Sequence, residues 1–414
     1  MNSEVLEKSS AQLIKEAEKL IAPEFETVNE IRDFNQKKVL QAFIDNKVAA
    51  EHFWSVSGYG HDDIGREVLD KVFAQVFSAE QAIVRPHFVS GTHTLACAIM
   101  GNLRAGEKLI SVAGSPYDTM QEVIGTRGDK RASLMGYGVL YDEVPLTKNL
   151  EIDYETLENK IDKSVNMVLI QRSRGYSLRK SLTIDVISKI INIVKSKNPD
   201  CICFVDNCYG EFVEKLEPTE VGADLIAGSL IKNPGGGIVE AGGYIAGKSK
   251  YVEQAAQRLT APGIGSEGGA MFNQGRLIFQ GLFMAPSVVS EAIKGAILAS
   301  RIFEEIGYIS TPKYNEKRTD LIQTITFNAG KPLEEFCKTL QFLSPVNSYV
   351  TPIPDDVPGY DDKLIMAGGT FIEGSTIELS ADGPMRPPYA VYMQGGLNYA
   401  HVKIVLEAIL DKVK

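Results

Sequence analysis

The sequence lacks the features that mark membrane, secreted and nucleic-acid-binding proteins. No stretch of its 414 residues approaches the run of about eighteen apolar residues that crosses a bilayer. The first residues, Met1 to Lys8, mix charges with single apolar residues and have no secretory apolar core. A formal net charge of −10 gives no excess of Lys and Arg for a nucleic-acid backbone. We therefore expect a cytoplasmic protein that acts on small molecules, without a nucleic-acid or membrane partner.

Cysteine and histidine are also scarce, and neither is spaced like a metal ligand. The cysteines are odd in number and contain no Cys-x-x-Cys pair, which argues against a disulfide framework and a structural zinc site. They are Cys97, Cys201, Cys203, Cys208 and Cys337. No two histidines have the i, i+4 spacing of a helical zinc site. We expect reduced thiols, histidines in caps and core hydrogen bonds, and no metal.

Short apolar runs alternate with amphipathic helical stretches from about residue 80 to 250. Strands separated by helices in this way form a mostly parallel sheet that helices cover on both faces. The expected strands are 81–85, 108–112, 166–170, 201–205, 224–227 and 243–246. A chain of 414 residues also favours a second, smaller domain. We predict a helical arm over 1–50, a large domain over 51–295 and a small domain over 296–414.

Helical patterns lie on both sides of this alternating region. From Glu4 to Lys47 apolar residues recur at helical spacing, with a break at Pro23. A long helical stretch begins beyond Gly269, and a closing helix is expected from Tyr399 to Val413. The segment from Ser344 to Pro388 is rich in Pro and Gly. We interpret it as the connection into the smaller domain.

Polar residues follow three of the expected strands, where open α/β sheets bind their ligands. Ser90-Gly-Thr-His93 opens a helix whose first N–H groups can hold a phosphate, although a plain helix cap has the same pattern. Asp206 directly follows the strand 201–205, where a structural hydrogen bond would also explain it. Lys232 precedes the glycines 235–237, and burial there would favour the neutral amine that a nucleophile needs. The three features together, in this order, indicate an enzyme site.

These residues lie in motifs that resemble one family. The motifs are Ser57-Gly-Tyr-Gly-His61, Ser90-Gly-Thr-His-Thr94, Ser115-Pro-Tyr-Asp118, Val205-Asp-Asn-Cys-Tyr-Gly210, Gly228-Ser-Leu-Ile-Lys-Asn-Pro-Gly-Gly-Gly237 and Asp382-Gly-Pro-Met-Arg-Pro-Pro388. Over about residues 30 to 410 the chain resembles the methionine γ-lyase-like carbon–sulfur lyases, often described as aluminium-resistance proteins and related to the cystathionine lyases. The resemblance implies the aspartate-aminotransferase fold (fold type I), with a mostly parallel seven-stranded sheet in the large domain and a smaller α+β C-terminal domain. It also implies pyridoxal 5'-phosphate as the cofactor.

The resemblance implies how the cofactor would be held. The backbone at Gly91 and Thr92, with the Ser229 hydroxyl, would bind its phosphate. Tyr117 would stack on one face of the pyridine ring and assist catalysis. Cys208 would pack against the other face.

The resemblance also implies which residues would contact the ring nitrogen, the substrate and a second subunit. Asp206 would pair with the protonated ring nitrogen, and Lys232 would carry the cofactor as a Schiff base and move protons. Arg386 would hold the substrate carboxylate by two parallel hydrogen bonds. Tyr59 would complete the site of a neighbouring subunit, so we expect a homodimer or homotetramer with shared active sites.

One motif departs from the pattern of the cystathionine lyases. Those enzymes use Tyr-x-Arg from a neighbouring subunit to reach the phosphate, whereas Tyr59-Gly60-His61 has no arginine. Either Arg66 or His61 could take its place.

The expected reaction is β- or γ-elimination from a sulfur amino acid such as cystathionine, cysteine or methionine, which yields ammonia, a 2-oxo acid and a thiol. Aldol cleavage or transamination stays open, because the reaction depends on which bond of the α-carbon lies perpendicular to the ring. A non-catalytic regulator that binds an amino acid is a further alternative. Gly242 to Ser249 also matches the P-loop pattern of ATPases, but the apolar residues between its glycines resemble a strand and not an open loop.

Overall fold

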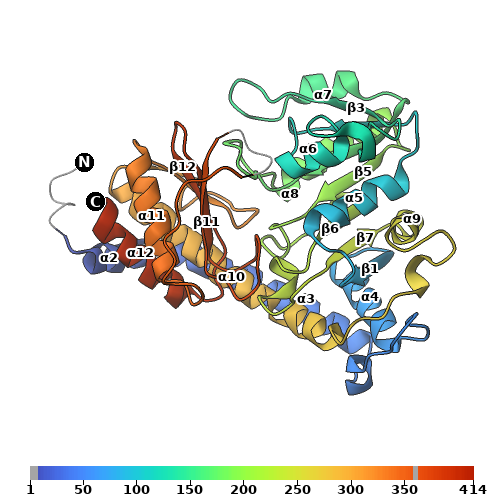
Figure 1. Ribbon diagram of the computed structural model, residues 1–414, viewed down its shortest axis with the longest axis horizontal. Helices are drawn as coiled ribbons and strands as arrows, with labels where there is room; N and C mark the ends of the chain where they lie inside the picture. Colours follow the sequence, from blue (N-terminus) through green and yellow to red (C-terminus); the bar gives the residue numbers. More distant parts are fainter. Residues whose placement is uncertain (1–7, 358–361) are drawn as a thin grey trace.

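The computed structural model describes residues 8–357 and 362–414, and it contains two separate β-sheets (Figure 1). Most of the segment from Met1 to Lys8, for which we predicted no secretory signal, lies outside the described residues. The larger sheet is surrounded by helices, and the smaller one has its helices on one side (Figure 1).

The larger sheet has seven strands in the order β1-β7-β6-β5-β4-β2-β3. Their bounds are β1 Gln81–Arg85, β2 Lys108–Ser111, β3 Leu140–Glu143, β4 Val165–Gln171, β5 Ile202–Asp206, β6 Leu225–Ser229 and β7 Gly243–Gly247. Strands β3, β2, β4, β5 and β6 pair in parallel, and β7 is antiparallel to both of its neighbours. The prediction of a mostly parallel seven-stranded sheet is therefore confirmed.

Six of the seven strands fall where the apolar runs predicted them, and β3 was missed. The run of apolar residues in β4 is continuous because helices cover this strand on both faces. Its residues Met167 and Leu169 pack with the helices on one side, whereas Val168 and Ile170 pack with those on the other. Strand β3 lies at the edge of the sheet, and none of its four residues is buried. It therefore has no apolar run that could have revealed it.

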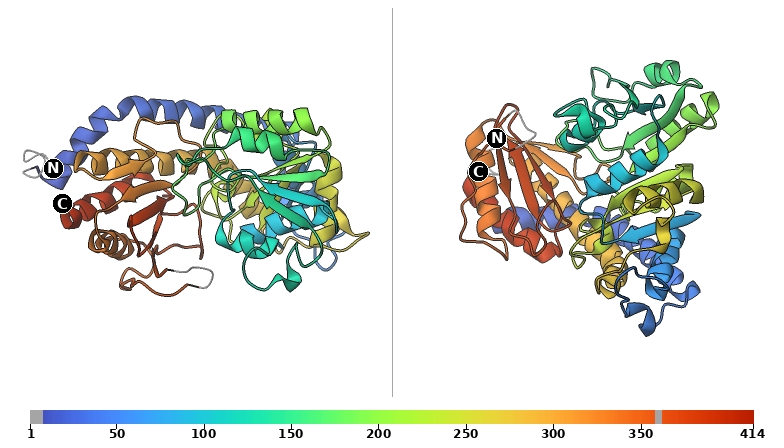
Figure 2. Two further views of the ribbon diagram at one scale, coloured as in Figure 1. Left: turned by 90° about the horizontal axis from the view of Figure 1, so that it is seen from above. Right: turned by 45° about the vertical axis from the view of Figure 1, so that its right-hand side comes forward.

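Helices connect the strands and cover the sheet on both faces (Figures 1 and 2). They are α4 Ile64–Val76, α5 Gly91–Asn102, α6 Asp118–Ile124, α7 Tyr154–Lys160, α8 Ile184–Lys197 and α9 Ser249–Leu259. Short 3-10 turns are η1 Ala50–Phe53, η2 Lys130–Ala132, η3 Pro218–Val221, η4 Asn233–Gly235 and η5 Gly265–Glu267. Helices α5 and α9 pack together on one face, and α8 lies over the other.

The smaller sheet is antiparallel throughout, in the order β10-β11-β12-β9-β8. Its strands are β8 Ile309–Thr311, β9 Gln323–Thr326, β10 Leu364–Ala367, β11 Ser380–Pro384 and β12 Ala390–Gln394, with helices α11 Gly330–Phe342 and α12 Tyr399–Val413. The interpretation of Ser344–Pro388 as a connection into the small domain is wrong, because β10 and β11 lie within it. Its Pro and Gly residues belong to the turns around these strands.

The arm and the long helix join the two sheets. Helices α2 (Ser10–Leu20) and α3 (Ala22–Asp45) are separated at Ile21, with Pro23 in the first turn of α3. Helix α10 (Gly275–Glu305) lies beside α3 and extends from the large sheet to the small one (Figure 2). The predicted domain boundary at residue 295 falls inside α10, and the division into three parts stays a prediction.

Helix α10 is, in the described residues, the one helix long and apolar enough to cross a membrane by length and composition. However, 72% of its most apolar window is buried inside the protein. It packs against α3, α12 and η4, so its apolar character is explained by the core.

Large-sheet and small-sheet segments meet at Tyr176 and Asp382. The Tyr176 hydroxyl donates to Asp382 Oδ2 at 2.8 Å, and the Tyr392 hydroxyl donates to the Tyr176 carbonyl at 2.9 Å. Asp382 is buried, and burial raises the pKa of its carboxyl to about 6. Because the unfolded chain binds this proton with an ordinary pKa of 3.8, ionised Asp382 opposes folding above pH 6.

We predict that Asp382→Asn raises the free energy of unfolding at pH 7 and above, by up to about 3 kcal/mol for a shift of this size. The gain should shrink between pH 6 and pH 4, because the folded parent protein itself becomes protonated there. Urea unfolding at pH 4, 5, 6 and 8 measures this difference, with the exposed residue Asp200→Asn as control. An equal effect at every pH would show that the Asp382 carboxyl is not the cause.

Candidate active site

The carboxyl ends of three neighbouring parallel strands form the floor of the candidate site. Strands β4, β5 and β6 end at Gln171, Asp206 and Ser229, and they are adjacent in the sheet (Figure 1). Gln171 is paired with Asp206 in the ladder. Parallel pairing thus places residues far apart in the sequence at one edge, where such sheets bind ligands.

The N-terminus of α5 lies against this edge. Ser90 is its N-cap, and the Ser90 hydroxyl accepts a hydrogen bond from the His93 N–H at 3.1 Å. A Cβ atom placed on Gly91 would lie 3.4 Å from Ser229 Cβ and 3.7 Å from Cys208 Sγ. The structure therefore brings Gly91, Ser229 and Cys208 together, and the first N–H groups of the helix are suited to an anion.

Tyr117 joins the same group from the loop before α6. Its backbone N–H donates to Gln171 Oε1 at 3.0 Å, and its hydroxyl lies 3.3 Å from Thr92 Oγ1. Burial raises the pKa of the Tyr117 phenol well above its ordinary value, and the nearby Asp206 and Cys208 add to this rise. The phenol is therefore held in its protonated form.

Asp206 is a buried carboxylate whose nearest described cations, Lys232 and Arg179, form no ion pair with it. It is 5% exposed, and it accepts a hydrogen bond from the Cys208 N–H at 3.1 Å. Within residues 8–357 and 362–414 it forms no ion pair. Burial raises its pKa, although the positive charges of Lys232 and Arg179 partly oppose the rise. A buried carboxylate in this state would be stabilised by a protonated ring nitrogen.

The Lys232 amine has two hydrogen-bond acceptors beside it. Its Nζ lies 3.0 Å from the Tyr209 hydroxyl and 2.8 Å from the Ser375 carbonyl oxygen. Burial disfavours the ammonium, but Tyr209, Cys208 and Asp206 outweigh it and the pKa of Lys232 is raised. Burial does favour the neutral amine, as expected, but in the chain alone the negative and polar groups around the amine reverse the net direction.

Tyr209 and Ser375 were missed by the sequence analysis. Tyr209 lies in the motif that contains Asp206 and Cys208, and its left-handed backbone (φ 68°) turns it toward Lys232. Ser375 belongs to the segment before β11, and the Ile377 N–H donates to the Ile231 carbonyl at 3.2 Å. The motif could have pointed to Tyr209, but nothing in the sequence indicates Ser375.

Arg386 lies apart from these groups in the structure. Its side chain is 58% exposed, and Nη1 forms an ion pair with Asp362 Oδ2 at 2.6 Å. Among the described residues it makes no hydrogen bond to another candidate site residue. Its role toward a substrate stays a prediction.

Tyr59 is also separate from the site of its own chain. It is 82% exposed, and its carbonyl accepts a hydrogen bond from the Gly269 N–H at 2.9 Å. Arg66 is buried below this loop and donates to the carbonyls of Gly60 at 2.6 Å, Glu267 at 2.8 Å and Gly269 at 3.0 Å. Since these bonds occupy both terminal nitrogens, Arg66 holds the loop and is poorly placed to reach a phosphate. His61 stays exposed beside Tyr59.

The segment that matches the P-loop pattern is a strand. Residues Gly243–Gly247 form β7, antiparallel to β1 and β6, and Lys248 pairs with Asp224 Oδ1 at 2.7 Å. No open loop lies between these glycines. The segment therefore has the form expected of a strand in the core.

The site fits pyridoxal phosphate on the chemistry of its own groups. It offers a primary amine, a buried unpaired carboxylate, an aromatic ring and a helix N-terminus at one sheet edge. These are the groups that would bind an aldehyde, a protonated ring nitrogen, a pyridine face and a phosphate.

Comparison with known proteins agrees with this arrangement. The family model described as methionine gamma-lyase matches residues 10–414. The uncharacterized protein YnbB of Bacillus subtilis is 48% identical over 399 residues, which are 96% of this chain and 95% of that protein. A solved structure described as a carbon–sulfur lyase involved in aluminum resistance, from Clostridium novyi, has a TM-score of 0.94 at 48% identity and covers 100% of this chain and 97% of its own.

A more distant structure bears on the fold alone. The pyridoxal-5'-phosphate-dependent protein YhfS from Escherichia coli is 13% identical and has a TM-score of 0.63, covering 93% of this chain and 97% of its own. The predicted fold class is thereby confirmed.

Proposed function

The chain belongs to the methionine gamma-lyase family, and from this membership we propose that it is a pyridoxal-phosphate-dependent lyase that cleaves a carbon–sulfur bond in a small amino acid. The observation that carries the proposal is the convergence of Lys232, Asp206 and the α5 N-terminus at one sheet edge. The buried, unpaired cysteines of the described residues support a reducing cytoplasm as its location.

We infer the following roles for the residues of the chain. When bound, pyridoxal phosphate withdraws electrons from the substrate α-carbon. The N–H groups at Gly91 and Thr92, with the Ser229 hydroxyl, would hold its phosphate, and Asp206 would keep its ring nitrogen protonated. Tyr117 would cover the ring from one face.

Proton movement would depend on Lys232. Its Nζ, held between the Tyr209 hydroxyl and the Ser375 carbonyl, would take the proton from the α-carbon and return it during the reaction. Tyr209 would position the amine by this hydrogen bond, and protonated Tyr117 is available as a donor.

The proposed net reaction breaks one carbon–sulfur bond and consumes one water. The sulfur leaves from the β- or γ-carbon as a thiol after it takes a proton, and the nitrogen leaves as ammonia. The carbon skeleton becomes a 2-oxo acid. Cystathionine, cysteine and methionine are the substrate types to which this applies.

We predict that Lys232→Ala abolishes the release of 2-oxo acid and thiol from every sulfur amino acid that the parent protein cleaves. The purified parent protein should absorb visible light, and borohydride should fix the cofactor to the peptide that contains Lys232. Peptide mass spectrometry and a 2-oxo-acid assay measure these results.

Lys248→Ala is the matched control, since Lys248 pairs with Asp224 on another part of the sheet. It should retain both the colour and the activity. Labelling of any lysine other than Lys232 would contradict the proposed site.

Arg386 is the residue we propose for the substrate carboxylate. Arg386→Lys should raise KM about tenfold or more, because one ammonium cannot replace two parallel hydrogen bonds. Asp362→Asn is the control, since it removes the ion-pair partner and leaves Arg386 free. The KM of Asp362→Asn should equal that of the parent protein or be lower. Steady-state kinetics measures both KM values. An unchanged KM of Arg386→Lys for every active substrate would show that Arg386 does not bind the substrate carboxylate.

We also propose that two subunits share each active site, because Tyr59 is 82% exposed and, within the described residues, makes no hydrogen bond to Lys232 of its own chain. Co-expressed Tyr59→Ala and Lys232→Ala subunits should regain up to about a quarter of the parent activity, since each hybrid dimer has one intact site. Light scattering should show a dimer or a tetramer.

The control mixture combines Asp206→Ala with Lys232→Ala. Both residues belong to the same site of one chain, so no hybrid can contain an intact site. Activity in this mixture, or a fully active monomer, would contradict the shared site.

A further inference from the structure

A cavity of about 250 Å³ lies where the segment after β4 meets the segment between β8 and β9. We call it the junction cavity. It is lined by ten residues from 174–183 and 312–320, none of which belongs to the candidate active site. Four of the ten are basic and two are acidic: Arg174, Lys180, Lys317, Arg318, Glu316 and Asp320.

Two of these basic side chains are buried and share one buried carboxylate, Asp320, as their main counter-charge. Arg174 is 3% exposed and Arg318 is 8% exposed, and neither forms an ion pair in the part of the chain that the structure describes. Arg174 makes only long hydrogen bonds, to the Thr311 carbonyl at 3.4 Å and to Thr324 Oγ1 at 3.3 Å. Arg318 donates to Gln323 Oε1 at 2.6 Å.

Three of their nitrogen atoms have no acceptor at all among the described residues. They are Nε of Arg174 and both Nε and Nη1 of Arg318. Burial and the neighbouring Arg174 lower the pKa of Arg318 to about 10, although Asp320 opposes this. Two buried guanidinium groups beside one carboxylate leave an excess of positive charge, which is unfavourable, so the pair favours binding of a further anion.

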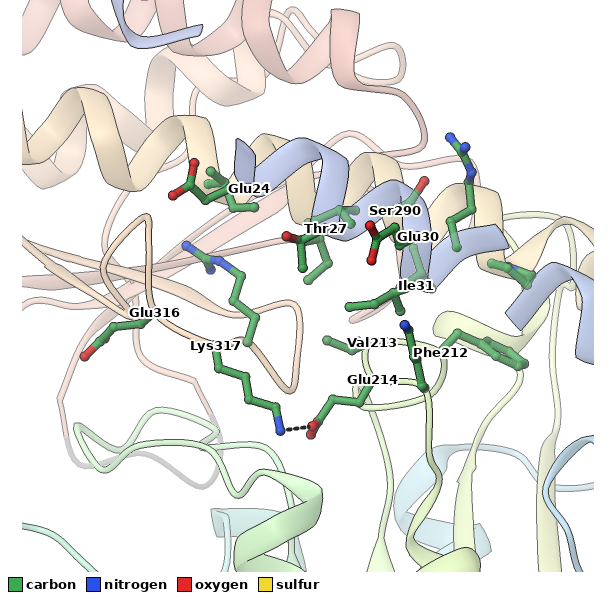
Figure 3. A pocket seen from close by; sticks show the side chains of 18 of the residues that line it. Glu24, Thr27, Glu30, Ile31, Phe212, Val213, Glu214, Ser290, Glu316 and Lys317 are labelled. Atoms are coloured by element: carbon green, nitrogen blue, oxygen red, sulfur yellow. Dashed lines mark ion pairs between the residues drawn. The ribbon is translucent and has the colours of Figure 1, made fainter. Parts of the chain in front are cut away.

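The other charges around the cavity are already paired. Lys180 binds Glu316 at 3.0 Å. Lys317 extends the other way, into an adjoining cavity of about 640 Å³, where it binds Glu214 at 2.7 Å (Figure 3). Asp320 accepts hydrogen bonds from the hydroxyls of Ser173 and Ser181. Arg174 and Arg318 thus share the negative charge of Asp320, which leaves the pair with an excess of positive charge.

The junction cavity also touches a helix N-terminus. Thr183, which lines the cavity, is the N-cap of the 14-residue helix α8. The first N–H groups of this helix already have acceptors, since Ile184 N–H donates to Glu214 Oε1 at 2.9 Å and Val186 N–H donates to Thr183 Oγ1 at 3.3 Å. The two guanidinium groups, and not the helix end, are therefore the donors available to an anion. The hydroxyls of Ser181 and Thr319 also line the cavity, and they donate to Asp320 Oδ2 and to the Leu182 carbonyl, respectively.

From these contacts we propose that the junction cavity binds a tetrahedral oxyanion, a phosphate or sulfate group, between Arg174 and Arg318. The group can be free phosphate or the phosphoryl group of a small ester, since both present the same oxygens. Arg174 follows β4 and Arg318 precedes β9, so the bound anion joins the two parts of the molecule. It would fix the segment whose Gly175 lies against Tyr117, where a Cβ on Gly175 would be 3.7 Å from Tyr117 Cβ.

The test uses the cofactor-loaded protein, so that the N-terminus of α5 is already occupied. Phosphate, sulfate and glycerol phosphate should each raise the melting temperature in a saturable way, relative to chloride at equal ionic strength. Arg318→Met should lose this rise or need at least about tenfold more anion, because charge-assisted hydrogen bonds are lost. Without oxyanion the variant should melt at the parent temperature or above it, since the repulsion between Arg174 and Arg318 is gone while Arg174 still faces Asp320.

Arg104→Met is the matched control, because Arg104 is exposed and bonds only backbone carbonyls at the end of α5. It should keep the full response, and any general stabilisation by salt will be common to both variants. Crystals soaked in selenate give a second measurement that needs no variant. An anomalous peak between Arg174 and Arg318 supports the proposal. A response equal to chloride, or selenate bound only elsewhere, overturns it.

Discussion

The parallel pairing of β4, β5 and β6 is the constraint on which the site depends. It brings Gln171, Asp206 and Ser229 to one edge of the sheet, although they are far apart in the sequence. Gln171 then holds Tyr117 through its backbone N–H, and Ser229 faces Gly91 at the start of α5. Each candidate residue of this edge is therefore positioned by a strand end or by a neighbour of one, and not by a flexible loop alone.

A buried charge network supports the turn that follows β5. Arg172 is fully buried and bonds Asn207 Oδ1 at 2.8 Å, while its guanidinium lies 3.6 Å from Glu217 and 3.4 Å from Glu214. Gly210 is required here, because a Cβ atom would collide with the Arg172 side chain. Removing one partner of such a network costs about 3–5 kcal/mol. The network thus fixes the turn that presents Cys208 and Tyr209 to the active-site amine.

The local pattern of apolar residues in the sequence was sufficient to predict most of the strands of the large domain. Apolar runs are visible wherever a strand is covered on both faces, as in β4, and the helix Tyr399–Val413 follows from its spacing alone. The three groups of the site were also recognisable, because each comes shortly after a predicted buried run and Asp206 follows its run directly. The same reasoning failed for β3 and for the strands within Ser344–Pro388, where edge positions, Pro and Gly hide the alternation.

Contacts between distant segments decided what the sequence could not. The pKa of Lys232 is raised because Tyr209, Cys208 and Asp206 surround the amine, whereas its sequence neighbours alone suggested the reverse. The Ser375 carbonyl reaches this amine because the segment before β11 lies against the segment after β6, and Arg174 meets Arg318 where the segment after β4 meets the segment before β9. The sequence by itself determined which groups the chain carries and where its strands end. The tertiary structure decided which charges are paired, because electrostatic interactions depend on distance in space and on burial.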